Sequence, residues 1–215
     1  LPYGVVFSFM SKIPCIYTHH NILPKMTRFQ YFIFNKLISC YIGISKKCTE
    51  KLVEYSGRDV KTIQNGICLN KIKKKLDCID NSSKVKAIAV GGLQAQKNYL
   101  YMIKAVSNLS SEALSRLQLY IAGEGPDKKE IEIFIKEKKL ESVVTLIGNR
   151  SDIPDLLYKS DLFLMSSAWE GLPIALIEAA ATGLPCLVTD VGGCSEVIDA
   201  CENGYYIGLG SYNEY

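Results

Sequence analysis

Several features that mark other protein classes are missing from this sequence of 215 residues. It has only two histidines, and none of its eight cysteines forms a CxxC pair, so the sequence does not indicate a zinc cluster. The cysteines are scattered through a chain much longer than a disulfide-stapled mini-domain, which favours free thiols in a reducing cytoplasm. No apolar run reaches the roughly 20 residues needed to cross a bilayer.

The charge balance is also modest. A formal net charge of +3 is too small to argue for a nucleic-acid partner. Basic residues are mixed with acids, as in the segment 128–139, which is typical of a solvated helix face. With 48% hydrophobic and 22% charged residues, the composition is that of a globular protein, and its length suits one domain plus part of another. No signal-peptide pattern is present, but the first residue is Leu1 rather than methionine, so we expect an upstream piece to be missing.

From about residue 84 onward, strand-like apolar runs alternate with amphipathic helical stretches. Strands are predicted at 85–90, 117–122, 143–147, 162–165 and 184–189, and helices at 99–109, from about 127, at 152–159 and at 173–182. This alternation predicts βαβ crossovers and a doubly wound, parallel α/β domain. Ligands bind such a domain beyond the carboxyl ends of its strands.

The first 66 residues contain too few strands for a stable domain. Strands are predicted at 12–18, 40–44 and 61–64, with helices at 24–38 and from the N-cap Ser45 to about Tyr55. We therefore predict that residues 1–68 are the incomplete end of an N-terminal domain. Residues 69–82 are then a lysine-rich linker, and residues 83–215 form a second domain.

The segment 166–178 (SSAWEGLPIALIE) is the most informative. Gly171 allows a ligand to approach the backbone, and Pro173 suits the first turn of a helix whose free N–H groups favour a diphosphate. Glu178 is the one charge on an apolar helix, so its carboxylate needs a partner, either ligand hydroxyls or an Arg or Lys. Glu170 is either a residue of the ligand crevice or an ordinary exposed loop glutamate.

Glycine-rich turns follow three of the predicted strands. Lys97 follows the Gly91-Gly92 turn, and it either neutralises a phosphate or is merely solvated. The turn at Gly123 allows close backbone approach. The Gly192-Gly193 pair, with Ser195 as the expected N-cap, is a second candidate nest for an anion or a sugar hydroxyl.

An ordered series of motifs resembles the family 4 glycosyltransferases, retaining enzymes of the GT-B fold. The series consists of YIGISKKCTE (41–50), VKTIQNGI (60–67), VGGLQAQKN (90–98), IAGEGP (121–126), LIGNRSDIPDLLYKSDLFLMSS (146–167), EGLPIALIEAAATGLP (170–185) and TDVGGCSEVI (189–198). The resemblance covers nearly the whole chain from about Pro14. It implies that residues 1–68 end an acceptor-side domain and that residues 83–215 form a nucleotide-sugar-binding domain, which we expect to lack its last helices. Two glutamates with seven residues between them, glycine and proline included, are highly specific in this setting.

The resemblance implies a role for each matching residue. Lys97 would contact the donor diphosphate, Glu170 would lie at the donor sugar, and Glu178 would bind the nucleotide ribose. Backbone N–H groups around Gly171 and Leu172 would hold phosphate and sugar oxygens. The remaining expected site residues are His20 (with His19 as the weaker match) at the cleft, Asn149 and Arg150 near the base, and Gly91, Gly92 and Gly123 along the donor.

One position departs from the family pattern. Many members have arginine where this sequence has Gly92, so diphosphate binding is expected to depend more on Lys97 and the helix start. The resemblance implies a metal-free mechanism without a cofactor, in which the leaving diphosphate is stabilised electrostatically. Neither carboxylate then has to be a covalent nucleophile, unlike the acids of retaining glycoside hydrolases.

The expected activity is transfer of a sugar from a nucleoside-diphosphate sugar, with UDP favoured over GDP, to a glycan or lipid-linked acceptor in polysaccharide or lipopolysaccharide assembly. The alternatives are a non-catalytic nucleotide-sugar-binding fragment and a GT-B sugar-nucleotide epimerase, which the Glu170 to Glu178 motif disfavours. We expect no nucleic-acid partner and a cytoplasmic location, with peripheral membrane contact through the missing N-terminal region as a further possibility.

Overall fold

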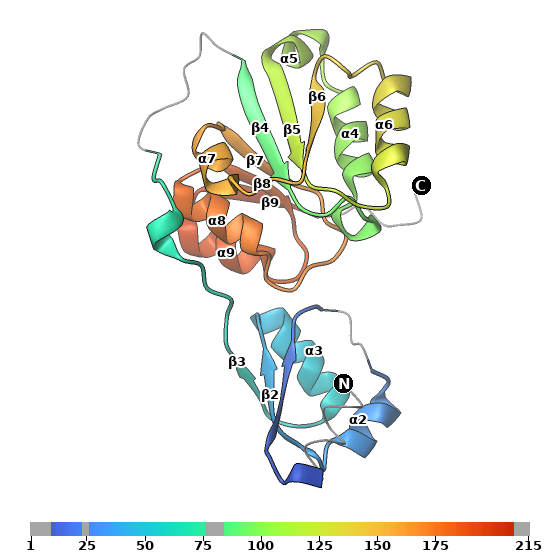
Figure 1. Cartoon of the computed structure of the whole chain (residues 1–215), viewed down its shortest axis with the longest axis vertical. Coiled ribbons are helices and arrows are strands. Elements are labelled where there is room, and N and C mark those ends of the chain that lie inside the picture. The colour runs from blue at the N-terminus through green and yellow to red at the C-terminus, as the bar shows by residue number, and fades with distance from the viewer. Residues whose placement is uncertain (1–9, 23–25, 76–83, 209–215) are drawn as a thin grey trace.

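The chain folds into two lobes. The computed structural model describes residues 10–22, 26–75 and 84–208. An N-terminal lobe (10–22 and 26–62) holds a three-stranded sheet, and a C-terminal lobe (84–208) holds a six-stranded sheet (Figure 1). Every strand pair in both sheets is parallel. The predicted α/β class is therefore confirmed.

The order of strands in the C-terminal lobe defines where a ligand can bind. The strands are β4 (Val85–Val90), β5 (Leu117–Ala122), β6 (Val144–Gly148), β7 (Leu162–Met165), β8 (Cys186–Thr189) and β9 (Gly204–Ile207). They lie in the order β6-β5-β4-β7-β8-β9, which reverses direction between β4 and β7. This is the doubly wound order, and its switch point lies beyond the carboxyl ends of those two strands.

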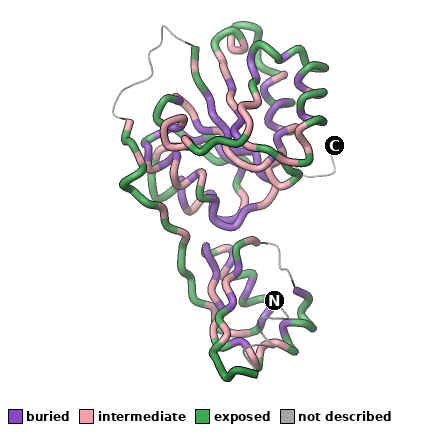
Figure 2. The backbone as a smooth tube through the Cα atoms, in the orientation of Figure 1, coloured by how far each residue is buried: buried purple, intermediate pink, exposed green. Residues whose placement is uncertain are grey.

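Helices cover the two faces of this sheet. The helices of the lobe are α4 (Tyr99–Ser107), α5 (Ser111–Arg116), α6 (Lys128–Glu137), α7 (Ile153–Tyr158), α8 (Ile174–Thr182) and α9 (Cys194–Cys201). Along β4, Ala87 and Ala89 pack in one apolar cluster with α4 and α6, whereas Ile88 packs in the other with α7, α8 and α9. Successive side chains of a strand point to opposite faces, so both faces need apolar residues. Figure 2 shows buried residues along the strands between these layers.

The N-terminal lobe is held by aromatic packing. Its elements are β1 (Cys15–His19), α2 (Arg28–Phe34), β2 (Ile38–Gly43), α3 (Lys46–Ser56) and β3 (Val60–Thr62). The rings of Tyr17 and Tyr41 lie 5.7 Å apart at an edge-on angle of 76°, and those of Tyr17 and Tyr31 lie 6.4 Å apart. All of these rings are buried, so they supply much of this small core.

The two lobes contact each other directly. Ile44 and Cys48, at the start of α3, belong to the apolar cluster of the C-terminal lobe. The Asn65 side chain donates to the carbonyl of Leu172 at 2.9 Å, and Lys47 forms a 2.8 Å ion pair with Asp190. The helix α3 therefore packs against the loops beyond the carboxyl ends of β7 and β8.

A connecting segment joins the lobes through the short helix η1 (Leu69–Lys71). At its end Lys75 binds the C-terminal lobe, with Nζ 2.8 Å from Asp161 Oδ1 and 2.6 Å from the carbonyl of Ser160. Residues 76–82 of the predicted linker lie outside the described residues. The predicted division into a piece of an N-terminal domain, a linker and a nucleotide-sugar domain stays a prediction.

Several predicted boundaries were wrong. The helix expected at 24–38 spans only Arg28–Phe34. It begins there because Thr27 caps it through a reciprocal pair of bonds with Gln30. Residues 24 and 25 lie outside the described residues. Ser195 lies inside α9, whose N-cap is Gly193. The helix α5 and the strand β9 were not predicted. The strands at 85–90 and 117–122 and the Ser45 cap, which accepts from Cys48 N at 3.1 Å, are confirmed.

Candidate functional site

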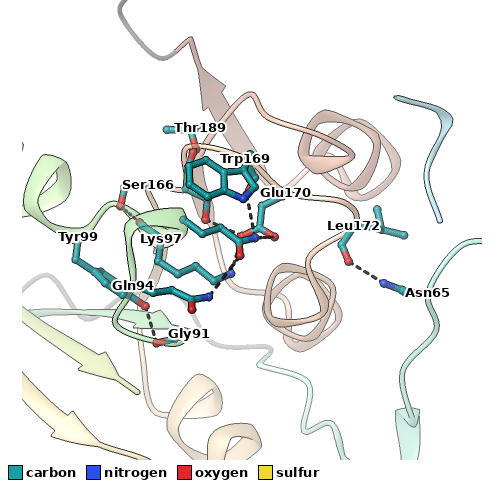
Figure 3. A network of polar contacts seen from close by, with 12 residues as sticks. Asn65, Gly91, Gln94, Lys97, Tyr99, Ser166, Trp169, Glu170, Leu172 and Thr189 are labelled. Carbon is teal, nitrogen blue, oxygen red and sulfur yellow. Dashed lines mark hydrogen bonds and ion pairs between the residues drawn. The ribbon is translucent and has the colours of Figure 1, made fainter. Parts of the chain in front are cut away.

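An ion pair lies at the switch point of the larger sheet. Lys97 ends the short helix η2 (Ala95–Lys97) after β4, and Glu170 lies in the loop after β7. Their Nζ and Oε1 atoms are 2.6 Å apart, and their side chains are only 15% and 7% exposed (Figure 3). The two residues come from the two strands at which the strand order reverses. The structure thus brings together two of the predicted site residues.

Neutral donors complete the environment of Glu170. Ser167 Oγ donates to Oε1 at 2.8 Å, and Gln96 Nε2 donates to Oε2 at 3.2 Å. The buried carboxylate therefore has a cation and two neutral partners, which offset much of its lost hydration. Glu170 is 6% exposed, so the reading as an ordinary exposed loop glutamate was wrong.

The two loops are also joined through the backbone. Ala168 N donates to the carbonyl of Gln96 at 2.8 Å, and Gln96 Nε2 donates to the carbonyl of Trp169 at 3.0 Å. Ser166 Oγ reaches the carbonyl of Lys97 at 2.9 Å (Figure 3). These bonds fix the loop after β4 against the loop after β7.

Gly91 leaves room for the lysine stem. A Cβ at position 91 would lie 2.7 Å from Lys97 Cε, closer than carbon atoms can approach. Tyr99 OH donates to the carbonyl of Gly91 at 3.0 Å, and burial, with a smaller effect of the Glu170 charge, raises the pKa of this tyrosine well above its ordinary value. Gly91 is therefore required for Lys97 to lie along the strand end.

Free N–H groups mark the start of α8. Pro173 is the N-cap of this helix and has no side-chain donor or acceptor to close it. Within the described residues, the N–H groups of Gly171 and Leu172 donate to no other protein group. Unpaired amides at a helix N-terminus attract anions, because the helix dipole adds to their own partial charge. The predicted anion-binding turn thus has the expected local geometry.

Glu178 lies about one helical turn after the first residue of α8. Its side chain is half-buried, and burial raises the pKa of its carboxyl above the ordinary value of 4.5. No cation and no hydrogen-bond donor lowers that pKa in the described part of the chain. A ligand with hydroxyl groups would supply the donors that the protein does not.

A hollow of about 250 Å³ lies at the carboxyl ends of β4, β5 and β6. It is lined by Val90, Gly91, Gly92, Ala122, Gly123, Glu124, Asn149, Arg150 and Ile153. Arg150 is exposed and holds Asp152 through bonds of 2.8 and 2.7 Å. The predicted residues Gly92, Gly123, Asn149 and Arg150 therefore gather in one place, next to Lys97 but not in contact with Glu170.

The two histidines are in different environments. His19 is buried, and its Nδ1 lies 3.2 Å from Tyr17 OH. His20 is exposed, and its carbonyl packs so closely on Gly171 that a side chain at 171 would collide with it. His20 thus lies across the lobe interface beside the start of α8.

The second predicted nest was wrong in one respect. The N–H of Gly193 donates to the carbonyl of Gly171 at 2.7 Å, so it is already occupied. Gly192 has a positive φ of 56° and packs on the carbonyl of Glu170. Gly193 therefore supports the loop after β7 through its N–H group, and Gly192 supports it through close packing.

Sequence reasoning missed Gln96 and Ser167. Neither residue type is diagnostic, and the bonds to Glu170 span 74 residues for Gln96. Ser167 stands three residues before Glu170, a spacing that could have suggested a local hydrogen bond.

Two further features are absent from the described residues. No group of three or more His, Cys, Asp or Glu side chains there could hold a metal ion. No helix of that part of the chain is long and apolar enough to cross a membrane. The predictions of a metal-free mechanism and of a cytoplasmic location stay predictions.

Comparison with known proteins supports the resemblance. The family model described as "Glycosyl transferases group 1" matches residues 73–214. The UDP-Gal:alpha-D-GlcNAc-diphosphoundecaprenol alpha-1,3-galactosyltransferase of Escherichia coli is 26% identical over 99% of this chain and 61% of its own length. The putative glycosyltransferase EpsF of Bacillus subtilis is 30% identical over 80% of this chain and 48% of its own length.

Solved structures share the fold. Anabaena HepE in complex with UDP has a TM-score of 0.81 at 22% identity, covering 96% of this chain and 62% of that protein. WaaG, a glycosyltransferase involved in lipopolysaccharide biosynthesis, has a TM-score of 0.70 at 20% identity, covering 88% and 56%. The chain spans about half to three fifths of the length of the relatives that it matches. With a parallel α/β fold that matches GT-B enzymes and a family model that covers most of its residues, the chain belongs to the group 1 glycosyl transferases.

Proposed function

We propose that this chain binds the donor in a retaining glycosyltransferase of family 4. The enzyme moves a sugar from a nucleoside-diphosphate sugar to a glycan or lipid-linked acceptor. The observation that carries the proposal is the buried Lys97–Glu170 pair at the switch point, next to free amides at the start of α8. A cation and a helix N-terminus suit a diphosphate, and a buried carboxylate suits sugar hydroxyls.

Each residue has a role in this proposal. Lys97 and the N–H groups of Gly171 and Leu172 stabilise the negative charge that develops on the diphosphate as it leaves the sugar. Glu170 accepts hydrogen bonds from the donor sugar, and Glu178 accepts them from the ribose. His20 approaches the donor from the N-terminal lobe. The acceptor then attacks on the face from which the diphosphate departs, so the configuration at the anomeric carbon is kept.

The hollow bounded by Gly92, Gly123 and Arg150 is assigned to the nucleotide base. UDP is the favoured nucleotide, and GDP is the next candidate. Support for UDP comes from the relatives: the name of the Escherichia coli enzyme specifies UDP-Gal, and HepE forms complexes with UDP and with UDP-glucose. Support for a lipid-linked acceptor comes from the same name, which specifies a diphosphoundecaprenol substrate. Polysaccharide or lipopolysaccharide assembly is the proposed setting.

Thermal unfolding with nucleotides tests donor binding. The 215-residue chain is heated with UDP, GDP, ADP and their common sugar conjugates, beside a Glu178→Ala variant. Saturation at about 100 times the dissociation constant adds roughly 2.7 kcal/mol of stability. Stabilisation by one nucleotide, reduced in Glu178→Ala but not in the control Glu132→Ala on the exposed side of α6, is the expected result. No stabilisation by any nucleotide would contradict the proposal.

Turnover is a separate test. A panel of acceptors with the stabilising donor, followed by NMR of the product's anomeric proton, distinguishes a transferase from a module that only binds. Formation of a product with the donor's configuration is expected for the retaining mechanism, and an inverted product would refute it.

A further inference from the structure

Among the described residues Glu170 has three hydrogen-bonding partners, of which one carries a charge. Its Oε1 receives Lys97 Nζ at 2.6 Å and Ser167 Oγ at 2.8 Å, while Oε2 receives Gln96 Nε2 at 3.2 Å. We propose that Gln96 and Ser167 are positioning residues that hold the Glu170 carboxylate toward the donor sugar when Lys97 turns to the diphosphate. This inference rests on the proposed function and adds two residues to it.

The charges on Lys97 and Glu170 explain why such residues are needed. A diphosphate carries more negative charge than one carboxylate, so it competes for the Lys97 ammonium. If Lys97 were the sole partner of Glu170, its departure would leave a carboxylate that is only 7% exposed without any donor. An unpaired buried charge is costly, and the side chain would turn to water or take up a proton. Neutral donors have no net charge for the diphosphate to attract.

Both neutral donors are held independently of Lys97. Ser167 is fully buried, and its own carbonyl accepts a 2.6 Å bond from Thr189 Oγ1. Gln96 is fixed at its backbone by Ala168 and at its side chain by the carbonyl of Trp169. Removal of the lysine contact therefore leaves their geometry in place.

The arrangement also separates the tasks of the two carboxylate oxygens. Oε1 carries two protein bonds and Oε2 carries one. A carboxylate oxygen can accept about two hydrogen bonds, so Oε2 has capacity for a ligand hydroxyl in the present state. Oε1 gains the same capacity once Lys97 turns away. The positioned carboxylate would thus contribute to binding of the sugar and not to binding of the bare nucleotide.

Calorimetric titration separates these contributions. The unmodified chain, Ser167→Ala, Gln96→Met, Lys97→Met and the exposed control Ser115→Ala are titrated with UDP, UDP-glucose, UDP-galactose and UDP-N-acetylglucosamine. We expect Ser167→Ala and Gln96→Met each to weaken binding of the preferred UDP-sugar by about tenfold, the loss of one bond to a charged group. Binding of UDP itself should change by less than about twofold. Lys97→Met should weaken UDP and the UDP-sugar alike.

The outcomes are distinct. A selective loss of UDP-sugar affinity supports the inference, since a merely structural role would weaken UDP equally. Equal losses for UDP and UDP-sugar, or no loss in either variant, would overturn it while the proposed function stands. Failure of the unmodified chain to bind any of the four ligands, or GDP and its sugar conjugates, would overturn the proposed function and the inference together.

Discussion

The carboxylate of Glu196, on α9, caps the helix α3 of the other lobe. Its Oε1 accepts the backbone N–H of Lys46 at 2.8 Å, across 150 residues of sequence. The same oxygen lies 3.4 Å from Lys47 N, and Oε2 accepts Gln64 Nε2 at 3.2 Å. A carboxylate at a helix N-terminus satisfies free N–H groups and complements the helix dipole. One side chain thus links α9, α3 and the connecting segment.

Replacing Glu196 should loosen the lobe interface. In Glu196→Ala we expect the free energy of unfolding to fall by about 1 to 2 kcal/mol, as for the loss of a helix cap. Hydrogen exchange at the amides of Lys46 and Lys47 should become faster, because their acceptor is gone. Hydrogen-exchange mass spectrometry of α3 measures this effect, with the exposed Asp199→Ala on the same helix as control. Unchanged protection at both amides would show that the link does not hold the interface.

The Lys97–Glu170 pair should show strong coupling. In Lys97→Met the buried Glu170 loses its cation, and we expect a fall of about 3 kcal/mol in the free energy of unfolding. The double variant Lys97→Met/Glu170→Gln removes both charges and should recover much of that loss. Chemical denaturation of the two single variants and the double variant gives the coupling energy. Additive effects in the double variant would contradict a direct ion pair.

Nucleotide binding should depend on the ionisation of Glu178. Burial raises the pKa of its carboxyl above 4.5 in the free protein, and ribose hydroxyls donate more strongly to the ionised carboxylate than to the neutral acid. Affinity is therefore highest above that raised pKa and weakens as the pH falls through it. Glu178→Gln does not titrate, so the ratio of the two dissociation constants across pH cancels the titration of the nucleotide itself. A ratio that stays constant with pH would exclude this role for Glu178.

Asp161 should contribute to stability in acid. Burial alone would raise the pKa of its carboxyl, but the bonds from Lys75 Nζ and Lys86 N lower it below 3.8. A depressed folded-state pKa gives stability that is present above the unfolded-state value and is lost as the pH falls through the folded-state value. Asp161→Asn should therefore cost about 1 to 2 kcal/mol at neutral pH and much less at low pH.

A neighbouring ion pair provides the control for that measurement. Lys73 and Asp155 are 2.7 Å apart, but their side chains are 60% and 47% exposed. Because water screens exposed pairs, Asp155→Asn should change stability by less than about 1 kcal/mol. Denaturation midpoints of both variants from neutral to acid pH test this contrast. Equal acid dependence in Asp161→Asn and the unmodified chain would refute the role of Asp161.

The structural features that the sequence predicted correctly depend mainly on residues that are close together along the chain. The strand at 85–90 follows from its apolar run, and the Ser45 cap follows from its position before an amphipathic helix. The placement of Lys97 near Glu170 follows from parallel strands that end at one edge of a sheet. The contacts of Gln96, Ser167 and Glu196 were not predicted, because glutamine, serine and glutamate occur at many surface positions and their partners lie far away or on another element.

The single tryptophan of the chain lies in the loop that carries the candidate site. Trp169 is next to Glu170, is partly buried, and accepts the amide of Gln96 through its carbonyl. The intrinsic fluorescence of this protein at tryptophan-selective wavelengths therefore comes from one side chain. That side chain belongs to the loop after β7, which is hydrogen-bonded to the loop after β4. A spectral change on addition of a small molecule reports on that segment without any attached label.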